Sequence, residues 1–244
     1  MLMDELRGVY YILMKDLKAY YFKPPNISWG ILFPLVLALA FSLRNPEGLI
    51  ELAPGLVAMA AVFGTTSMEA IVITFERRTG ALERLFLAPL STHSILFAKV
   101  LGGAMFGGMI STAMTALAVI FFKMRVTNLL LFSTTLCLTL LTLSALGALV
   151  AVSVKEVFEA QTLSNYFRFP MLFLSGVFIP VQSIPLPLRY VSYLLPLTYS
   201  VDALKGVTLH QTSIGWLMLD TVVLILFFFG FMYASNAMLK RSLK

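Results

Sequence analysis

Charged residues are scarce in this sequence. Asp, Glu, Lys and Arg make up 12% of its 244 residues, which is about half their share in an ordinary soluble domain. Hydrophobic residues make up 59%, and the mean hydropathy is +0.89. Because one soluble core cannot bury so much apolar surface, the composition excludes an ordinary soluble domain and predicts that lipid is the main solvent.

Side chains that build metal sites and disulfides are also nearly absent. Cys137 is the single cysteine, which excludes a disulfide framework or a cysteine zinc cluster within the chain. The two histidines, His93 and His210, are expected on opposite sides of the membrane. No metal site is therefore expected.

A nucleotide-binding loop is missing as well. The sequence has no G-x-x-x-x-G-K-[ST] motif and no Gly-Lys dipeptide. Such a loop is the usual cradle for nucleotide phosphates. The chain is therefore not expected to be an enzyme or to bind a cofactor, and any ATPase that serves it would be another chain.

The chain has six long apolar runs instead. A helix crosses about 30 Å of hydrocarbon with about 20 residues, and continuous rather than alternating runs favour helices over a barrel. The sequence predicts an all-α integral membrane protein whose single domain, residues 1–244, has six transmembrane helices. The runs cover residues 27–43, 52–75, 95–122, 129–154, 163–180 and 214–239.

The distribution of Lys and Arg predicts the orientation. With six spans both termini share one side, and that side holds thirteen of the eighteen basic residues. Basic residues concentrate on the cytoplasmic side of membrane proteins, so both termini of this multi-pass protein of the cell membrane are expected in the cytoplasm. Anionic lipid headgroups account for the net charge of +6 without a nucleic-acid partner.

The N-terminal residues 1–25 have the pattern of an amphipathic helix. Apolar side chains recur at spacings of three and four, and charged residues fill the remaining face. A helix of this kind lies in the membrane interface, either as a simple anchor or as a lever attached to a moving part. The apolar positions are Leu6, Val9, Tyr10, Leu13, Leu17, Tyr20 and Tyr21, and the charged ones are Asp4, Glu5, Arg7, Lys15, Asp16 and Lys18.

A second short helix is predicted between the second and third runs, within residues 76–90. Gly80 or Thr79 precedes it, and Pro89 stops it. Ser91 is placed to cap the third span. Its apolar side would carry Leu82, Leu85 and Phe86, and its charged side Glu83 and Arg84. From these residues alone, a positive-inside anchor that folds as a helix is an alternative to a dedicated contact.

Three charged residues fall within the apolar runs and need partners or water. Glu69 and Arg168 are expected at a similar depth, where they would form an intramembrane pair that is structural or, alternatively, lines the pathway. Asp220 is expected near the outer interface. In the fourth run a series of hydroxyls favours helix packing over cavity lining.

The segment between the fifth and sixth runs, residues 181–213, is too apolar for a hydrated loop and too broken for a span. Prolines interrupt it, and tyrosines supply interfacial aromatics. We expect a pair of short re-entrant helices in the outer leaflet. They would act as an outer gate or, alternatively, as an aromatic belt that positions the spans. The prolines that break the segment are Pro180, Pro185, Pro187 and Pro196.

Two motifs carry a resemblance to a known family. The first is Glu76-Arg77-x-x-Gly80-x-Leu82-Glu83-x-Leu85 followed by Pro89-Leu90-Ser91 and Lys99. The second, residues 174–206, includes Pro196-Leu197-Thr198-Tyr199 and Asp202, with Leu195 where the family pattern has Asn. In this order, and with six runs, they resemble the type-2 permeases of ABC transporters over essentially the whole chain.

The resemblance implies a function. In such exporters the short cytoplasmic helix is a coupling helix seated in a separate ATP-binding subunit, which holds ATP and Mg. The permease forms a homodimer or heterodimer around the pathway. The coupling contact would involve Glu76, Arg77, Gly80, Leu82, Glu83, Arg84, Leu85 and Pro89. The outer gate would involve Phe178, Pro180, Tyr190, Tyr193, Pro196, Tyr199 and Asp202.

The expected function is outward transport of an amphipathic or hydrophobic substrate, such as a drug, a lipid or a glycan-lipid. An ion-driven secondary transporter is an alternative, but no inverted repeat is visible and Glu69 is the one deep-lying acid. A lipid-modifying membrane enzyme is a further alternative, although it would need clustered His, Asp or Glu at one depth.

Overall fold

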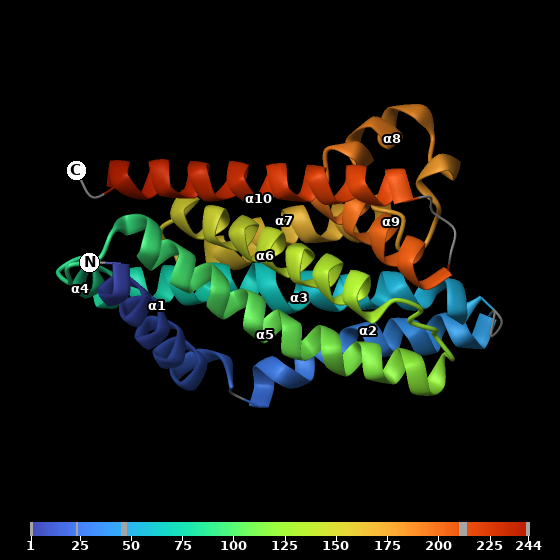
Figure 1. Ribbon diagram of the computed structural model, residues 1–244, viewed down its shortest axis with the longest axis horizontal. Coiled ribbons are helices and arrows are strands. Elements are labelled where there is room, and N and C mark those ends of the chain that lie inside the picture. Colours follow the sequence, from blue (N-terminus) through green and yellow to red (C-terminus); the bar gives the residue numbers. More distant parts are fainter. Residues whose placement is uncertain (1, 23, 45–47, 210–213, 243–244) are drawn as a thin grey trace.

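The computed structural model describes residues 2–22, 24–44, 48–209 and 214–242, which form helices joined by short turns (Figure 1). No β-strand occurs within these ranges, so the predicted all-α class is confirmed for them. In chain order the elements are α1 (Leu2–Asp16), the π-helical η1 (Leu17–Tyr21), α2 (Pro24–Arg44), α3 (Leu49–Arg78), α4 (Ala81–Leu85), α5 (Thr92–Phe121), α6 (Leu129–Ser153), α7 (Val157–Leu174), the 3-10 helix η2 (Val181–Ser183), α8 (Leu186–Tyr193), α9 (Pro196–Leu209) and α10 (Ile214–Ser242).

Helix α3 is the centre of the bundle. Helices α2, α5, α6, α7 and α9 all pack against it, and most of its residues from Ala53 to Glu76 are buried. Helix α10 packs on α6 and α9, but many of its apolar side chains, such as Leu226 and Phe229, are exposed. Burial of apolar surface therefore fixes α3 most firmly, while α10 leaves a broad apolar face uncovered.

Each of the six predicted apolar runs lies wholly or mostly on one helix, namely α2, α3, α5, α6, α7 or α10. Among the described residues, four helices are long and apolar enough to cross a membrane: α3, α5, α6 and Gly215–Arg241 of α10. Helix α2 contains only the shorter apolar stretch Ile31–Phe41, and the 18 residues of α7 include Glu159 and Arg168. The integral-membrane fold is supported, whereas crossings by α2 and α7 stay predictions.

The predicted fifth run, 163–180, extends beyond its helix. Helix α7 ends at Leu174, and the chain then turns through Gly176, whose φ is +80°. A left-handed backbone of this kind favours glycine and interrupts a helix. The last residues of the run therefore form a loop that leads to Pro180, not the end of a span.

Close helix approaches depend on glycine. A Cβ at Gly107 of α5 would clash with the side chain of Thr65 on α3. A Cβ at Gly147 of α6 would lie 2.5 Å from the backbone oxygen of Thr66. Helices α5 and α6 can therefore approach α3 this closely only because these positions carry no side chain.

Two hydroxyls of α6 join it to neighbouring helices. Ser144 Oγ donates to the carbonyl oxygen of Val100 on α5 at 2.8 Å, and Thr142 Oγ1 lies 3.2 Å from the carbonyl oxygen of Leu224 on α10. Both hydroxyls are buried. For these two residues the packing role predicted for the hydroxyls of the fourth run is confirmed.

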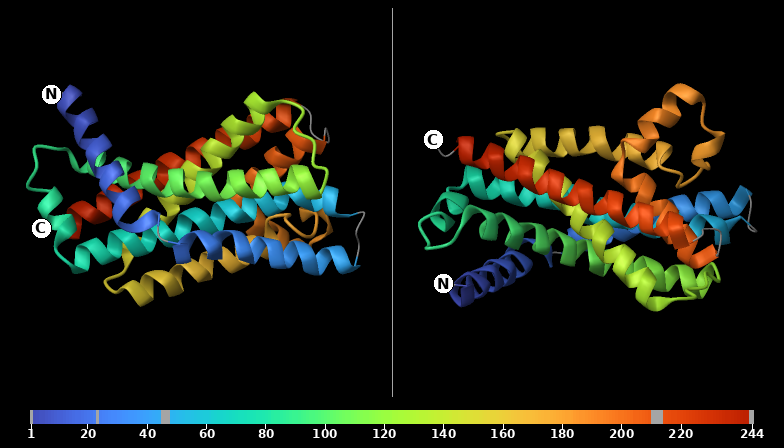
Figure 2. Two further views of the ribbon diagram at one scale, coloured as in Figure 1. Left: turned by 90° about the horizontal axis from the view of Figure 1, so that it is seen from below. Right: turned by 45° about the horizontal axis from the view of Figure 1, so that its top comes forward.

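The short helices gather at opposite ends of the bundle. Helix α4, the start of α1 and the end of α10 lie at one end, here called the α4 end, and α8 lies at the other, the α8 end (Figures 1 and 2). The predicted pair of short helices in segment 181–213 is observed as α8 and α9. Residues 210–213, and His210 with them, lie outside the described residues.

Candidate functional site

At the α4 end, one glycine separates α3 from the short helix α4. The N–H of Thr79 donates to Phe75 O at 3.0 Å and ends α3, and Gly80 follows with φ of 69°. Glycine adopts this left-handed conformation without the strain that other residues suffer. Gly80 therefore sets the angle at which α4 leaves α3.

Helix α4 has the two faces that its sequence predicts. Leu82 is buried, and Leu85 and Phe86 are half-buried against the same apolar cluster, which includes Ile12 of α1 and Ile95 of α5. On the other side Glu83 and Arg84 are exposed, as is Pro89 in the following loop. The helix is thus packed onto the bundle while its charged side remains accessible.

The regular part of this helix is shorter than the predicted segment 76–90. Glu76 and Arg77 belong to the last turn of α3, and α4 ends at Leu85. Beyond it the N–H groups of Phe86, Leu87 and Ala88 each bond the carbonyl three residues earlier, at 3.1–3.2 Å. The chain therefore continues as tight turns, so that Pro89 follows the helix instead of stopping it.

An ionic cluster, here called the buried ionic cluster although Lys15 is exposed at its edge, joins α1, α3 and α5 one turn before Gly80. It is formed by Lys15 and Asp16 at the end of α1, Glu76 of α3 and Lys99 of α5. Lys99 Nζ lies 2.7 Å from Asp16 Oδ2 and also pairs with Glu76, and Lys15 Nζ lies 2.5 Å from Glu76 Oε1. Asp16 and Glu76 are fully buried and Lys99 is 1% exposed. Three helices therefore share one set of paired charges.

The cluster corrects two predictions. Glu76 was predicted to contact the ATP-binding subunit, and Asp16 to lie on the polar face of a surface helix, but neither carboxylate is accessible. The reason is the contact between α1 and α5, which brings Lys99 against both acids. Helix α1 is therefore docked on the bundle, while Leu6 and Tyr10 on it stay exposed.

Burial and pairing oppose each other in this cluster. Burial raises the pKa of Asp16, although the positive charge of Lys99 acts to lower it. Burial would lower the pKa of Lys15, but its hydrogen bond to Glu76 and the nearby negative charges leave the pKa raised. Lys15 therefore stays protonated and shares its charge with the two acids.

The predicted pairing of Glu69 with Arg168 is wrong. Glu69 Oε2 accepts a hydrogen bond of 2.5 Å from the hydroxyl of Tyr21. The Arg168 guanidinium instead lies over the ring of Phe63, 4.3 Å from its centroid. Phe63 and Glu69 are six residues apart on α3, about 9 Å along the helix, so the two charged groups sit at different depths.

The basic residues that precede α4 contact the loop before α7. Arg77 Nη1 lies 3.4 Å from the carbonyl oxygen of Val154, and Arg78 Nη1 lies 2.8 Å from Glu156 Oε2 in an exposed ion pair. Exposed pairs of this kind add little stability. Arg77 is therefore turned partly toward the protein, whereas Glu83 and Arg84 of α4 face outward.

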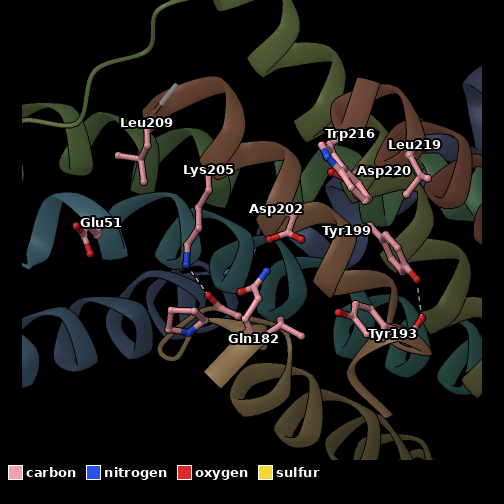
Figure 3. Close-up of a pocket in the computed structure, with 13 residues that line it drawn as sticks. Glu51, Gln182, Tyr193, Tyr199, Asp202, Lys205, Leu209, Trp216, Leu219 and Asp220 are labelled. Atoms are coloured by element: carbon pink, nitrogen blue, oxygen red, sulfur yellow. Dashed lines mark hydrogen bonds between the residues drawn. The ribbon is translucent and has the colours of Figure 1, made fainter. Parts of the chain in front are cut away.

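The α8 end contains a cavity of about 550 Å³, here called the outer pocket (Figure 3). Helices α9 and α10, the start of α3 and the segment after α7 surround it. Its lining residues are Glu51, Gly176, Pro180, Val181, Gln182, Tyr193, Tyr199, Asp202, Lys205, Leu209, Trp216, Leu219 and Asp220.

Of the residues that the structure describes, three carboxylates and one ammonium group line the outer pocket. Lys205 Nζ donates a hydrogen bond of 2.6 Å to the carbonyl oxygen of Gly176, so the cation holds the loop after α7 (Figure 3). Asp220 is only 5% exposed. Among the described residues it accepts no hydrogen bond and forms no ion pair. The pocket therefore has an excess of negative charge.

Burial shifts the protonation of the polar groups on α9. It raises the pKa of Asp202, partly offset by the charge of Lys205, and it lowers the pKa of Lys205, partly offset by Asp202 and Glu51. The ionised form of each group is therefore less favoured than in water. A cation that entered the pocket would favour the ionised form of Asp202.

The predicted gate residues divide between the pocket and its surroundings. Tyr193, Tyr199, Asp202 and Pro180 line it. The other three do not: Phe178 stacks on Phe41 with ring centroids 5.0 Å apart, Tyr190 is exposed, and Pro196 is buried at the start of α9.

Sequence reasoning did not assign Glu51, Lys205, Trp216 and Asp220 to one site. The available signal was the presence of charged residues near the ends of apolar runs, which Asp220 and Glu51 both show. At the other end the equivalent signal was Lys99, which lies inside a long apolar helix.

Comparison with known proteins identifies the family. The sequence profile described as "ABC-2 type transporter" matches residues 7–209, which include α4, the buried ionic cluster and much of the outer pocket. The chain belongs to the ABC-2 type transporter family. Its permease motifs and its lack of a nucleotide-binding loop agree with that membership.

Individual relatives agree with the family. The chain is 30% identical over 194 residues to ABC transporter G family member 20 of Dictyostelium discoideum, covering 77% of this chain and 26% of that protein. It is 25% identical over 162 residues to the "Probable multidrug ABC transporter permease YbhR" of Escherichia coli, covering 66% of this chain and 44% of the relative.

A further Escherichia coli relative, the inner membrane transport permease YadH, is 26% identical over 157 residues, covering 63% of this chain and 60% of YadH. In each case the matched region is less than two thirds of the relative's own length.

The two ends of this ABC-2 permease provide surfaces that could contact another protein or bind a ligand. Among the described residues no group of three or more His, Cys, Asp or Glu side chains is arranged to hold a metal ion. The α4 end offers an exposed charged helix on a packed base, and the α8 end offers a charged, aromatic cavity.

Proposed function

We propose that this chain is the permease subunit of an ABC exporter, and that it moves an amphipathic or hydrophobic molecule outward with ATP hydrolysed by a separate subunit. The cargo is a drug, a lipid or a glycan-lipid. One observation carries the proposal: in a member of the ABC-2 family, α4 packs its apolar side on the bundle and leaves Glu83 and Arg84 exposed. This arrangement suits a helix that is gripped by another protein.

In this proposal α2, α3, α5, α6, α7 and α10 cross the cell membrane, and both termini and α4 face the cytoplasm. The position of α4 beside the start of α1 and the end of α10 supports an even number of crossings (Figure 1). The excess of basic residues predicted for this side supports its cytoplasmic location. Helices α8 and α9 then lie in the outer leaflet as re-entrant helices.

The ATP-binding subunit would bind the exposed side of α4. Closure of that subunit on ATP and Mg would push α4, and Leu82 would transmit the push to α1, α3 and α5 because it is buried among them. The ionic cluster adds a second connection, since Glu76 lies one turn before Gly80 and is paired with α1 and α5. The unit would move as a rigid body.

A complete pathway needs a second permease, either another copy of this chain or a similar one, because one chain supplies half of a symmetric pathway. The exposed apolar side chains of α10 and α7, such as Phe229 and Phe173, would face lipid or the second permease. The outer pocket would lie where cargo leaves the membrane.

The test is charge reversal on α4. Glu83→Arg places a positive charge beside Arg84, and a like-charge contact at an interface costs several kcal/mol. We expect export of fluorescent amphiphiles by the complex in vesicles to fall by about tenfold or more, while ATP hydrolysis continues and membrane insertion is unchanged.

Lys240→Glu is the matched control, because Lys240 is exposed at the same end of the bundle but lies on α10. Its export should equal that of the unmodified chain. Full export by Glu83→Arg, or purification of the chain from its host without any ATP-hydrolysing partner, would contradict the proposal.

A further inference from the structure

We infer that the outer pocket is a binding site for an organic cation that carries apolar or aromatic groups. If the chain is the exporter proposed above, this cation is its cargo, and only that last step rests on the proposed function. Binding itself is a property of this chain and can be measured without ATP or a partner.

The first support is charge. Glu51, Asp202 and Asp220 line the pocket, and Lys205 is the one cationic side chain among its described lining residues. When all four are ionised, two negative charges are left over. Lys205 directs its ammonium group to Gly176 O, away from an ion pair with any carboxylate in the described parts of the chain. An anionic ligand would meet net repulsion, and a cation would meet attraction.

The second support is the position of Asp220. The residue is 5% exposed and lines the pocket, and within the ranges that the structure describes it has no hydrogen-bond or ion-pair partner. Its oxygens are not among the fully buried side-chain atoms that lack a partner, so the carboxylate reaches the open space of the pocket. Charged residues inside membrane helices mark ligand or ion pathways by default. A cationic ligand in the pocket would supply the missing partner.

The third support is the aromatic wall. Tyr193, Tyr199 and Trp216 line the same cavity as the carboxylates (Figure 3). The Tyr199 hydroxyl donates to Tyr193 O at 2.8 Å, and its ring lies 6.1 Å from that of Phe227, so the ring is held in place. Aromatic faces attract cations and bury apolar groups.

Volume and geometry favour an organic cation over a metal ion. The cavity of about 550 Å³ has the size of pockets that hold drug-sized molecules. A metal ion needs several oxygen ligands at one point. In the described part of the chain the carboxylates form no group arranged to hold one.

The test uses two ions of matched shape and opposite charge, tetraphenylphosphonium and tetraphenylborate. Equilibrium dialysis against the purified full chain in detergent should give saturable binding of the phosphonium and none of the borate. Asp220→Asn should weaken phosphonium binding by about tenfold or more, as expected for loss of one Coulombic attraction in a site that is partly shielded from water. Asp202→Asn should weaken it to a smaller extent because that group is less buried.

Two controls separate binding from folding. Asp220→Asn removes an unpaired carboxylate, so its Tm should equal or exceed that of the unmodified chain, whereas a purely structural role would lower it. Glu159→Gln removes an exposed carboxylate at the other end and retains the capping geometry of α7, because Gln also serves in a capping box; its affinity should not change. Equal binding of both ions, absence of phosphonium binding, or full affinity in Asp220→Asn would overturn the inference.

Discussion

The two ends of this permease bury carboxylates in opposite ways. At the α4 end, Asp16 and Glu76 are fully buried and both are paired with lysines from neighbouring helices. At the α8 end, Asp220 is almost as deeply buried, and among the described residues it has no ion-pair partner. The carboxylates are paired within the protein at one end, whereas at the other Asp220 faces a cavity.

The difference indicates that the buried charges at the α4 end stabilise the fold, whereas those at the α8 end are available to bind a ligand. A paired set whose members come from three helices resists relative movement, because displacing any helix would leave a buried charge alone. An unpaired carboxylate in a cavity contributes nothing to the fold and is available to a ligand. In the proposed mechanism the first set transmits force from α4, and the second binds cargo.

The largest expected effect comes from removing the central cation of the paired set. Lys99→Met leaves Asp16 without its main partner and Glu76 with Lys15 alone, and breaking a buried pair in this way costs about 3–5 kcal/mol. In a protein of this size that loss lowers the Tm by about 6–20 °C. Thermal unfolding of the purified protein measures it.

The rescue variant sharpens this prediction. Lys99→Met combined with Asp16→Asn and Glu76→Gln removes the charges together, and it should recover most of the lost Tm because no buried charge is then left alone. If Lys99→Met has the Tm of the unmodified chain, the cluster does not hold the helices together.

A medium effect is expected when one hydroxyl is removed at each end. Tyr21→Phe deprives the buried Glu69 of its hydrogen bond and should cost about 1–3 kcal/mol. Tyr199→Phe removes a hydroxyl that bonds the carbonyl of the exposed Tyr193, and should cost about 0.5–1 kcal/mol. Paired Tm measurements test the ranking, and an equal or reversed ranking would contradict it.

The smallest expected effect is a pH dependence at the α8 end. Burial raises the pKa of Asp202 above its unfolded value, which is about 3.9. Folding therefore favours the protonated form of Asp202. Its contribution to the free energy of unfolding is complete at a pH below the unfolded pKa and is lost as the pH rises through the folded pKa. Asp202→Asn lacks this titration, so its Tm relative to that of the unmodified chain should rise between pH 4 and pH 7.

Comparing the two proteins at each pH cancels the titration of the groups that they share and that do not interact with Asp202. A Tm difference that falls as the pH increases would show that Asp202 is stabilised in its ionised form by a partner.

Much of the secondary structure could be predicted from the sequence because it depends on interactions between residues that are close in the chain. The apolar runs required helices, and Ser91 was expected to cap the third span; its hydroxyl accepts from the Ser94 N–H at 3.1 Å. The spacing of Leu82, Glu83 and Arg84 predicted the two faces of α4. These results depend on residues within one or two turns of each other.

The errors arose where contacts between distant segments decide the outcome. Whether Glu76 faces solvent or Lys99 depends on where α1 docks, and 61 residues separate Glu76 from its other partner Lys15. The pairing of Glu69 with Arg168 failed because the apolar runs do not specify the depth of each residue closely enough: Glu69 meets Tyr21, whereas Arg168 lies over Phe63 at a different depth. The outer pocket likewise combines α3, α9 and α10, whose proximity no local pattern reveals.

The central claim is that α4 is a cytoplasmic helix gripped by an ATP-binding subunit, and single-cysteine labelling tests it most directly. Cys137 is the single native cysteine, so a Cys137→Ala background leaves none. Two single cysteines are then introduced into this background at exposed positions. Glu83→Cys reports the accessibility of α4, and Tyr190→Cys reports that of α8. A membrane-impermeant maleimide is then applied to inside-out and right-side-out vesicles.

We predict that Glu83→Cys reacts only in inside-out vesicles and is protected when the ATP-binding subunit is bound, and that Tyr190→Cys reacts only in right-side-out vesicles. Labelling of Glu83→Cys from the outside, or equal labelling with and without the bound subunit, would contradict the account.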